Sequence, residues 1–176
     1  MKTNIALIGY MGTGKTVVGQ FLAEKLNRKF LELDWMIEEQ AEKKIPDIFK
    51  EGGEITFREY EIEATKNVAG ENNAVIACGG GVVLNKINTD RLRENGITVY
   101  LTASPEVILE RVSDEKGQRP LLEVEDQLKT IKEMLEFRKP FYERAADITV
   151  DTSELSIGEV VEKIIEKLKE DESFNL

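Results

Sequence analysis

The sequence contains no histidine and only one cysteine in 176 residues. The lack of histidine excludes nucleophiles that a histidine base activates and zinc sites that histidines ligate. The single cysteine, Cys78, excludes an internal disulfide, and because it ends an apolar run we expect it to be a small core residue. No apolar run approaches the length of a membrane span, and no targeting segment precedes the first predicted strand. We therefore expect a cytoplasmic protein.

Positive charge is scarce as well, since 24 Lys and Arg residues face 34 Asp and Glu residues and the formal net charge is −10. A nucleic acid or an anionic membrane would find no basic surface on such a protein, so we expect neither as a partner. The length suits one domain, residues 1–176, which can hold a three-layer core but is too short for two full-sized domains. We expect this domain to be a monomer.

Against this background, residues 9–16 form a distinctive glycine-rich segment. They read Gly-Tyr-Met-Gly-Thr-Gly-Lys-Thr and fit the phosphate-binding loop pattern G-x-x-x-x-G-K-[ST] at every position. Residues 5–8 are an apolar run typical of a buried parallel strand. A helix is predicted to follow, with one apolar face formed by Val18, Phe21, Leu22 and Leu26. This order directs backbone N–H groups and the positive end of a helix dipole to one point, which predicts an anion site.

Each residue type in the loop suits a nucleotide. Glycines at 9, 12 and 14 permit backbone conformations and close approaches that a Cβ would block. Lys15 can reach the β- and γ-phosphates as a mobile charge, and the Thr16 hydroxyl can ligate Mg²⁺. The predicted nucleotide site consists of Gly12, Thr13, Gly14, Lys15, Thr16 and Val17. Thr16 is the predicted metal ligand and Mg²⁺ the predicted cofactor.

The rest of the chain alternates strand and helix patterns. Further strands are predicted at 29–33, 74–78, 97–101 and 148–150. Helices are predicted after Pro46 up to a break at Gly52 and Gly53, at 54–68, from Pro105 to about Val112, at about 126–146 and after a capping box of Ser156 and Glu159. These patterns predict an α/β protein with the three-layer phosphate-loop NTPase fold, in which helices cover both faces of a five-stranded parallel sheet.

Ligands in such sheets bind at the carboxyl ends of the strands. The phosphate-binding loop, Asp34 and the glycines at 79–81 all follow predicted strands, so we expect them along one rim. Two polar excursions, a substrate-binding subregion at about 33–62 and a mobile lid at about 113–125, favour a kinase that closes over a small second substrate. The chain lacks the N-K-x-D signature of GTP-binding switches, because its nearest string, at 85–88, reads Asn-Lys-Ile-Asn.

We expect the second substrate to be anionic. An acidic protein needs a specific cation to bind a carboxylate, and the planar guanidinium of arginine grips both oxygens. Arg58 stands just past the Gly52-Gly53 break, and Arg138 lies in the second charged helix. On spacing alone, either could also be an ordinary surface arginine.

Several motifs in order give the chain its resemblance to shikimate kinases. They are the loop at 9–16, Leu33-Asp34, Phe57-Arg58, Gly79-Gly80-Gly81, Arg119-Pro120-Leu121-Leu122 and Arg138-Lys139-Pro140-Phe141-Tyr142. The match covers nearly the whole chain. The resemblance implies transfer of the γ-phosphoryl group of ATP to the 3-hydroxyl of shikimate, in aromatic amino acid biosynthesis. The alternatives are another small-molecule kinase, such as a gluconate or nucleoside monophosphate kinase, and a non-catalytic nucleotide-dependent binding module.

The resemblance also implies roles for individual residues. Lys15, Asp34 and Arg119 would be catalytic, with Asp34 bound to the substrate hydroxyls and able to accept the reacting proton. Arg58 and Arg138 would bind the substrate carboxylate. Arg111 would lie against the adenine, and Arg119, on the lid, would reach the phosphates.

The glycines at 79–81 would contact the substrate, Gly80 through its backbone. They could instead form a plain turn, and Asp34 could be a helix N-cap. The family often has Asp-x-Asp where this chain has Glu32-Leu33-Asp34, so a role of Glu32 at Mg²⁺ stays open. Trp35 could line the substrate pocket or simply pack.

Overall fold

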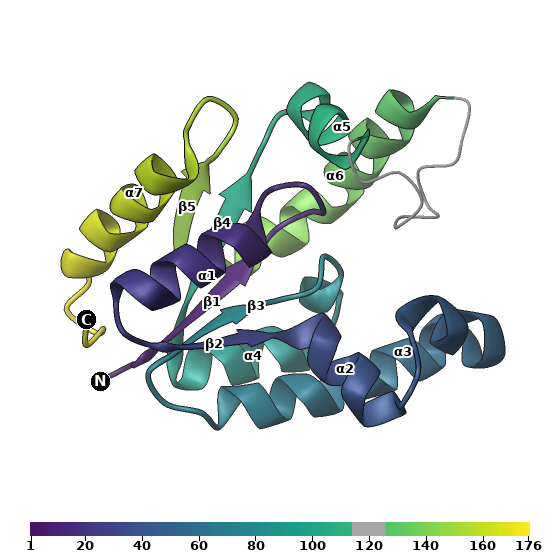
Figure 1. Ribbon diagram of the computed structural model, residues 1–176, viewed down its shortest axis with the longest axis horizontal. Helices are drawn as coiled ribbons and strands as arrows, with labels where there is room; N and C mark the ends of the chain where they lie inside the picture. The colour runs from purple at the N-terminus through teal and green to yellow at the C-terminus, as the bar shows by residue number, and fades with distance from the viewer. Residues whose placement is uncertain (114–125) are drawn as a thin grey trace.

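The computed structural model describes residues 1–113 and 126–176. Five parallel strands form one sheet in the order β2-β3-β1-β4-β5, as Figure 1 shows. The strands are β1 (Asn4–Ile8), β2 (Lys29–Glu32), β3 (Ala74–Ala77), β4 (Gly96–Thr102) and β5 (Ile148–Asp151). All five predicted strands are therefore confirmed, with ends that differ by at most one residue.

In the central strand, β1, the four residues that follow Asn4 are all apolar. Ile5 and Leu7 pack into the core on one face of the sheet, whereas Ala6 and Ile8 pack into the core on the other. All four side chains are fully buried. Successive side chains of a strand point to opposite faces, so a strand covered on both sides needs an unbroken apolar run.

Helices cover both faces. On one face, α1 (Lys15–Lys25) and α7 (Ile157–Lys169) lie side by side. The predicted capping box of Ser156 and Glu159 opens α7. The other face carries α2 (Leu33–Ala41), α3 (Ile45–Ala69), η1 (Val82–Leu84), α4 (Lys86–Glu94), α5 (Pro105–Ser113) and α6 (Gln127–Ala145). The predicted three-layer architecture is confirmed.

The predicted apolar face of α1 is wrong at one position. Val18 and Leu22 are buried as expected, but Phe21 is 53% exposed. Gly19 and Ala23 are buried instead. At roughly 100° per residue, positions 18, 19, 22 and 23 lie within one sector, and position 21 lies about 130° from the centre of that sector. Their burial places Phe21 on the solvent side.

The connections around α3 and α5 follow the sequence closely. Pro46 lies in the first turn of α3, and Gly53, with φ 70° and ψ −171°, breaks that helix as predicted. Ser104 caps α5, because its Oγ accepts a hydrogen bond from the backbone N–H of Val107 at 3.3 Å. Of the predicted lid, residues 114–125, including Arg119, lie outside the described residues.

Helix α4 was not predicted. This helix has only two large apolar residues, Ile87 and Leu92, so it lacks a helical apolar period. It is held by the buried side chain of Leu92 and by the buried amide of Asn88, which donates to the carbonyl of Val82 at 3.4 Å. Within residues 1–113 and 126–176, no helix is both long and apolar enough to cross a membrane.

Candidate active site

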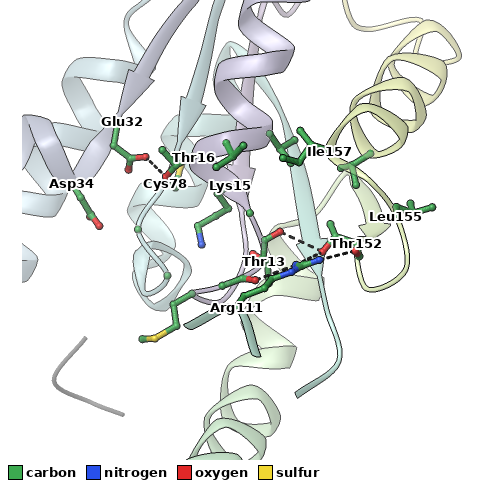
Figure 2. A pocket seen from close by; sticks show the side chains of 18 residues that line it. Thr13, Lys15, Thr16, Glu32, Asp34, Cys78, Arg111, Thr152, Leu155 and Ile157 are labelled. Atoms are coloured by element: carbon green, nitrogen blue, oxygen red, sulfur yellow. Dashed lines mark hydrogen bonds between the residues drawn. The ribbon is translucent and has the colours of Figure 1, made fainter. Parts of the chain in front are cut away.

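A cavity of about 420 Å³ opens at the carboxyl ends of β1, β2 and β3. The phosphate-binding loop forms one side, and Glu32, Asp34, Gly79 and Gly80 form the other (Figure 2). The predicted rim is therefore present. β1 lies between β3 and β4 in the sheet. The strands β2 and β3 are therefore added on one side of β1, and β4 and β5 on the other. Parallel sheets bind ligands at such a switch point.

The loop delivers the N-terminus of α1 to this cavity. Gly14 precedes the helix with φ 93°, a left-handed conformation that favours glycine. No side chain caps α1, so its first N–H groups keep their capacity to bind a ligand. The hydroxyl of Thr13 donates to the carbonyl of Tyr10 at 2.8 Å and closes the loop on itself. A phosphate group fits this combination of free donors and helix dipole.

Lys15 projects into the cavity in Figure 2. Its Nζ donates to the carbonyl oxygens of Gly9 at 2.8 Å and Tyr10 at 3.0 Å. The loop thus holds the ammonium group at the point where phosphates would enter, and a phosphate oxygen can accept a bond from the same nitrogen.

Thr16 and Glu32 meet beside Lys15. The Thr16 hydroxyl donates to Oε2 of Glu32 at 2.7 Å, and Glu32 is 7% exposed. Burial raises the pKa of Glu32 above its ordinary value, although the bond from Thr16 opposes this shift. Two oxygen ligands next to a phosphate site fit Mg²⁺, which usually takes one or two protein ligands and completes its shell with phosphates and water. Among the described residues, no group of three or more Cys, Asp or Glu side chains is arranged so that it could hold a metal ion.

Arg111 reaches the loop from α5. Its Nη1 donates to the carbonyl of Gly12 at 3.1 Å and to the hydroxyl of Thr152 at 3.0 Å, and its Nη2 donates to the Thr152 carbonyl at 2.9 Å. The Thr152 hydroxyl in turn donates to the carbonyl of Thr102 at 3.0 Å. Figure 2 shows this group of bonds at the edge of the cavity. The structure therefore brings Arg111 to the predicted nucleotide site and adds Thr152, which the sequence did not single out.

The triple-glycine turn lies against charged side chains at the far end of the cavity. A Cβ placed on Gly79 would lie 2.9 Å from Oδ1 of Asp34 and 3.4 Å from Oε2 of Glu61. A Cβ on Gly81 would lie 2.5 Å from Nη2 of Arg58. A Cβ at either position would displace the Asp34 carboxylate or the Arg58 guanidinium, so glycine lets these two groups lie against the backbone. Asp34 lies in the first turn of α2, and its predicted alternative role as N-cap is wrong because Glu32 occupies that position.

Arg58 is fixed by a carboxylate that sequence reasoning missed. Its Nη1 donates to Oε1 of Glu61 at 2.9 Å, and its Nη2 contacts Glu54 at 3.2 Å. Glu61 is 1% exposed, and its Oε2 has no hydrogen-bond partner among the described residues. Burial raises the pKa of Glu61, and the positive charge of Arg58 opposes the rise. Arg58 and Glu61 are three residues apart, a spacing that predicts contact on a helix. Since α3 contains other oppositely charged pairs at similar spacing, the sequence does not distinguish this pair from them.

Arg138 approaches the same turn from α6. Its Nη1 would lie 3.5 Å from a Cβ on Gly80, and its guanidinium carbon lies 5.8 Å from the centre of the Tyr10 ring. Its Nε is buried without a hydrogen-bond partner in the described ranges. The two arginines thus flank neighbouring glycines, Gly80 and Gly81, and present charge to one spot.

Two other side chains singled out from the sequence lie differently. Trp35 is 55% exposed, packs edge-on against Phe30 with ring centres 6.1 Å apart, and does not line the cavity. Cys78 is buried at the cavity wall as a core residue, and burial raises the pKa of its thiol. The core interpretation of Cys78 is confirmed, and Trp35 packs on Phe30 outside this cavity.

Comparison with known proteins extends these observations. Residues 11–169 match the family model described as shikimate kinase. A shikimate kinase of Caldanaerobacter subterraneus subsp. tengcongensis is 48% identical over 162 residues, which cover 92% of this chain and 94% of the relative. One from Pelotomaculum thermopropionicum is 46% identical over 167 residues, 95% and 96% of the two chains. The solved shikimate kinase of Acinetobacter baumannii in complex with shikimate superposes with a TM-score of 0.91 at 35% identity, covering 98% of this chain and 96% of the other.

Proposed function

The chain belongs to the shikimate kinase family, and from this premise we propose which of its residues bind each substrate and assist the reaction. Its activity is transfer of the γ-phosphoryl group of ATP to a hydroxyl group of shikimate. The observation that supports the residue assignment best is the cavity itself. It joins the phosphate-binding loop at one end to Asp34, Gly79 and Gly80 at the other, and Arg58 and Arg138 lie against Gly81 and Gly80 of the same turn.

The nucleotide occupies the loop end. The N–H groups of Gly12 to Val17 surround the β-phosphate, and Lys15 exchanges its bonds to the loop carbonyls for bonds to the β- and γ-phosphates. Arg111 lies against the adenine, held in place by Thr152 and the loop. Phosphoryl transfer depends mainly on positioning and charge neutralisation, and these groups supply both.

Mg²⁺ binds beside the loop through the Thr16 hydroxyl, with Glu32 next to it. When bound, the ion neutralises charge on the β- and γ-phosphates. The longer side chain of glutamate reaches Thr16 directly, so the residues present fit the ion although the pattern is Glu-x-Asp. Glu32 accepts a hydrogen bond from the Thr16 hydroxyl. The lone pairs of the Thr16 oxygen are therefore directed toward the cavity.

Shikimate occupies the far end. Arg58 and Arg138 bind its carboxylate, and the buried Nε of Arg138, which has no partner among the described residues, favours a polar ligand at this point. Glu61 keeps the Arg58 guanidinium in place. Asp34 lies against Gly79 and binds the ring hydroxyls, where it can accept the proton of the reacting 3-hydroxyl. The glycines at 79–81 allow the substrate to approach the backbone closely.

Several parts of the proposal rest on the sequence. We propose a single domain over residues 1–176, with a substrate-binding subregion at about 33–62, and we propose that it acts as a cytoplasmic monomer. Arg119, on a lid at about 113–125, is proposed to contact the phosphates, and it lies outside the described residues.

A coupled assay of ADP release tests the assignment. We expect turnover with shikimate and none above background with gluconate or AMP. Shikimate methyl ester is the matched control substrate, because it keeps every ring hydroxyl but cannot pair with two arginines. We expect its KM to rise by at least about a hundredfold, since a buried guanidinium would stay without its partner. Equal use of the ester would contradict the carboxylate site, and ATP binding without turnover would favour a binding module.

A further inference from the structure

Tyr142 of α6 is fully buried behind the triple-glycine turn. Its hydroxyl donates a hydrogen bond to the carbonyl oxygen of Gly80, a residue 62 positions away in the chain. Its ring stacks on the ring of Tyr100 in β4, with centres 4.9 Å apart and planes at 17°. The aromatic stack fixes the ring, and the fixed ring aims its hydroxyl at the glycine turn.

The same hydroxyl lies beside Arg138, one helical turn earlier in α6. Burial raises the pKa of the Tyr142 phenol, although the positive charge of Arg138 opposes this rise. The phenol is therefore protonated near neutral pH and donates its one proton to the Gly80 carbonyl. Nη1 of Arg138 approaches the same residue, at 3.5 Å from a Cβ placed on Gly80. Tyr142 and Arg138 thus both lie against Gly80.

A run of three glycines needs such a restraint from outside. Glycine has the widest choice of backbone conformations, and a glycine turn has no side chain of its own to hold it. The peptide unit between Gly80 and Gly81 is planar, so fixing its carbonyl also fixes the direction of the Gly81 N–H. A substrate group bound by this turn and by Arg138 would lose affinity if either could rotate.

We propose that Tyr142 is a positioning residue for shikimate. Its hydroxyl holds the Gly80 peptide and the Arg138 guanidinium in a fixed relation, and these two groups together form half of the site for the substrate carboxylate. The inference rests on the proposed role of Arg138 in binding that carboxylate. Tyr142 does not touch the nucleotide end of the cavity, so its effect is confined to one substrate.

The test is Tyr142→Phe, which keeps the stacked ring and removes the hydroxyl. We expect calorimetry to show shikimate binding weakened by about five- to thirtyfold, as for loss of a buried hydrogen bond. We expect the KM for ATP to change less than about twofold and kcat less than about threefold. Tyr100→Phe is the matched control: it removes a phenol hydroxyl from the same stack, and we expect unchanged shikimate affinity. Tyr142→Phe with normal shikimate affinity, or with both substrates weakened equally, would overturn the inference.

A double-mutant cycle with Arg138→Ala separates this inference from the proposed site. If Tyr142 acts through Arg138, Tyr142→Phe should weaken shikimate binding less in the Arg138→Ala background than in the wild type. Additive effects would show that Tyr142 acts by a separate route and would overturn the inference. If Arg138→Ala alone left shikimate binding intact, the carboxylate assignment itself would be wrong. All binding is measured well below the lowest melting temperature, so a loss of stability alone cannot produce the substrate-specific effect.

Discussion

The hydroxyl of Thr16 and the carboxylate of Glu32 are bonded at 2.7 Å, although sixteen positions separate the two residues. Thr16 belongs to the first turn of α1, and Glu32 ends the neighbouring strand, β2. The bond places a buried carboxylate beside the phosphate-binding loop. These two oxygens are the ones that would hold Mg²⁺ in the proposed site.

We predict that Glu32→Gln raises the free Mg²⁺ concentration needed for half-maximal rate by about tenfold to a hundredfold, the usual effect of losing a group that orients a metal ligand. The oxygen of the introduced amide can still accept the hydrogen bond from Thr16, so this variant tests the negative charge alone. Initial rates at fixed ATP and varied Mg²⁺ measure the effect. Glu32→Asp keeps the charge on a shorter side chain, and its Mg²⁺ requirement should lie between those of the wild type and Glu32→Gln. An unchanged Mg²⁺ requirement in Glu32→Gln would remove Glu32 from the metal site.

Lys15→Ala should lower kcat by about a hundredfold or more, because the γ-phosphoryl group loses its mobile positive charge during transfer. The fold should survive, since Lys15 projects into the cavity and its Nζ bonds the carbonyls of Gly9 and Tyr10 in the loop rather than the core. Lys25→Ala is the matched control, because Lys25 lies in the same helix but pairs with Glu162 on the surface. It should keep its rate within about twofold. Near-normal turnover of Lys15→Ala would refute the nucleotide assignment.

Arg58→Ala and Arg138→Ala should each weaken shikimate binding by roughly 2–5 kcal/mol, because the substrate carboxylate would be left partly unpaired. ATP affinity should change little. Calorimetry with each substrate alone measures both. Arg144→Ala, an exposed arginine of α6 that lies over the Phe141 ring, serves as the control for loss of positive charge. ATP binding reduced as much as shikimate binding would argue against a carboxylate site.

Glu61→Gln should change the pH dependence of stability in a defined direction. Burial raises the folded-state pKa of Glu61 above its ordinary value of 4.5, so the folded protein binds more protons than the unfolded one between the two pKa values. The stability due to Glu61 is therefore complete below about pH 4 and is lost as pH rises through the raised pKa. We predict that the free energy of unfolding of the wild type, minus that of the variant, falls over this range. Urea unfolding across the pH series measures it, and a difference that grows with pH would contradict the shift.

Thr152→Val should raise the KM for ATP by about threefold to thirtyfold, since Arg111 loses an acceptor worth roughly 0.5–2 kcal/mol. Valine keeps the shape of the buried side chain, which is 3% exposed, and removes its hydroxyl. The KM for shikimate should stay within about twofold, which distinguishes loss of Arg111 positioning from a general loss of activity. Steady-state kinetics with each substrate varied in turn distinguishes a rise in the KM for ATP alone from a general loss of activity.

Local patterns in the sequence are enough to predict several parts of this protein. Each strand contains a short apolar run, and the phosphate-binding loop needs only eight consecutive residues, with glycine where the backbone turns left-handed at Gly14. The Ser104 and Ser156 caps and the Gly53 break are equally local, because each depends on atoms within three or four residues. Motif order along the chain carried the prediction of Arg58, Arg138 and the triple glycine as one substrate site.

The side chains that hold that site in place could not be predicted from such patterns, because they meet only in the folded chain. Glu61 is one of many glutamates in α3 until the fold buries it against Arg58 and Gly79. Thr152 lies 41 residues from Arg111, and Tyr142 lies 62 residues from Gly80. No helical or strand period relates residues so far apart. They meet because parallel strands bring their carboxyl ends together at one edge of the sheet, and the energy of each contact depends on burial that only packing creates.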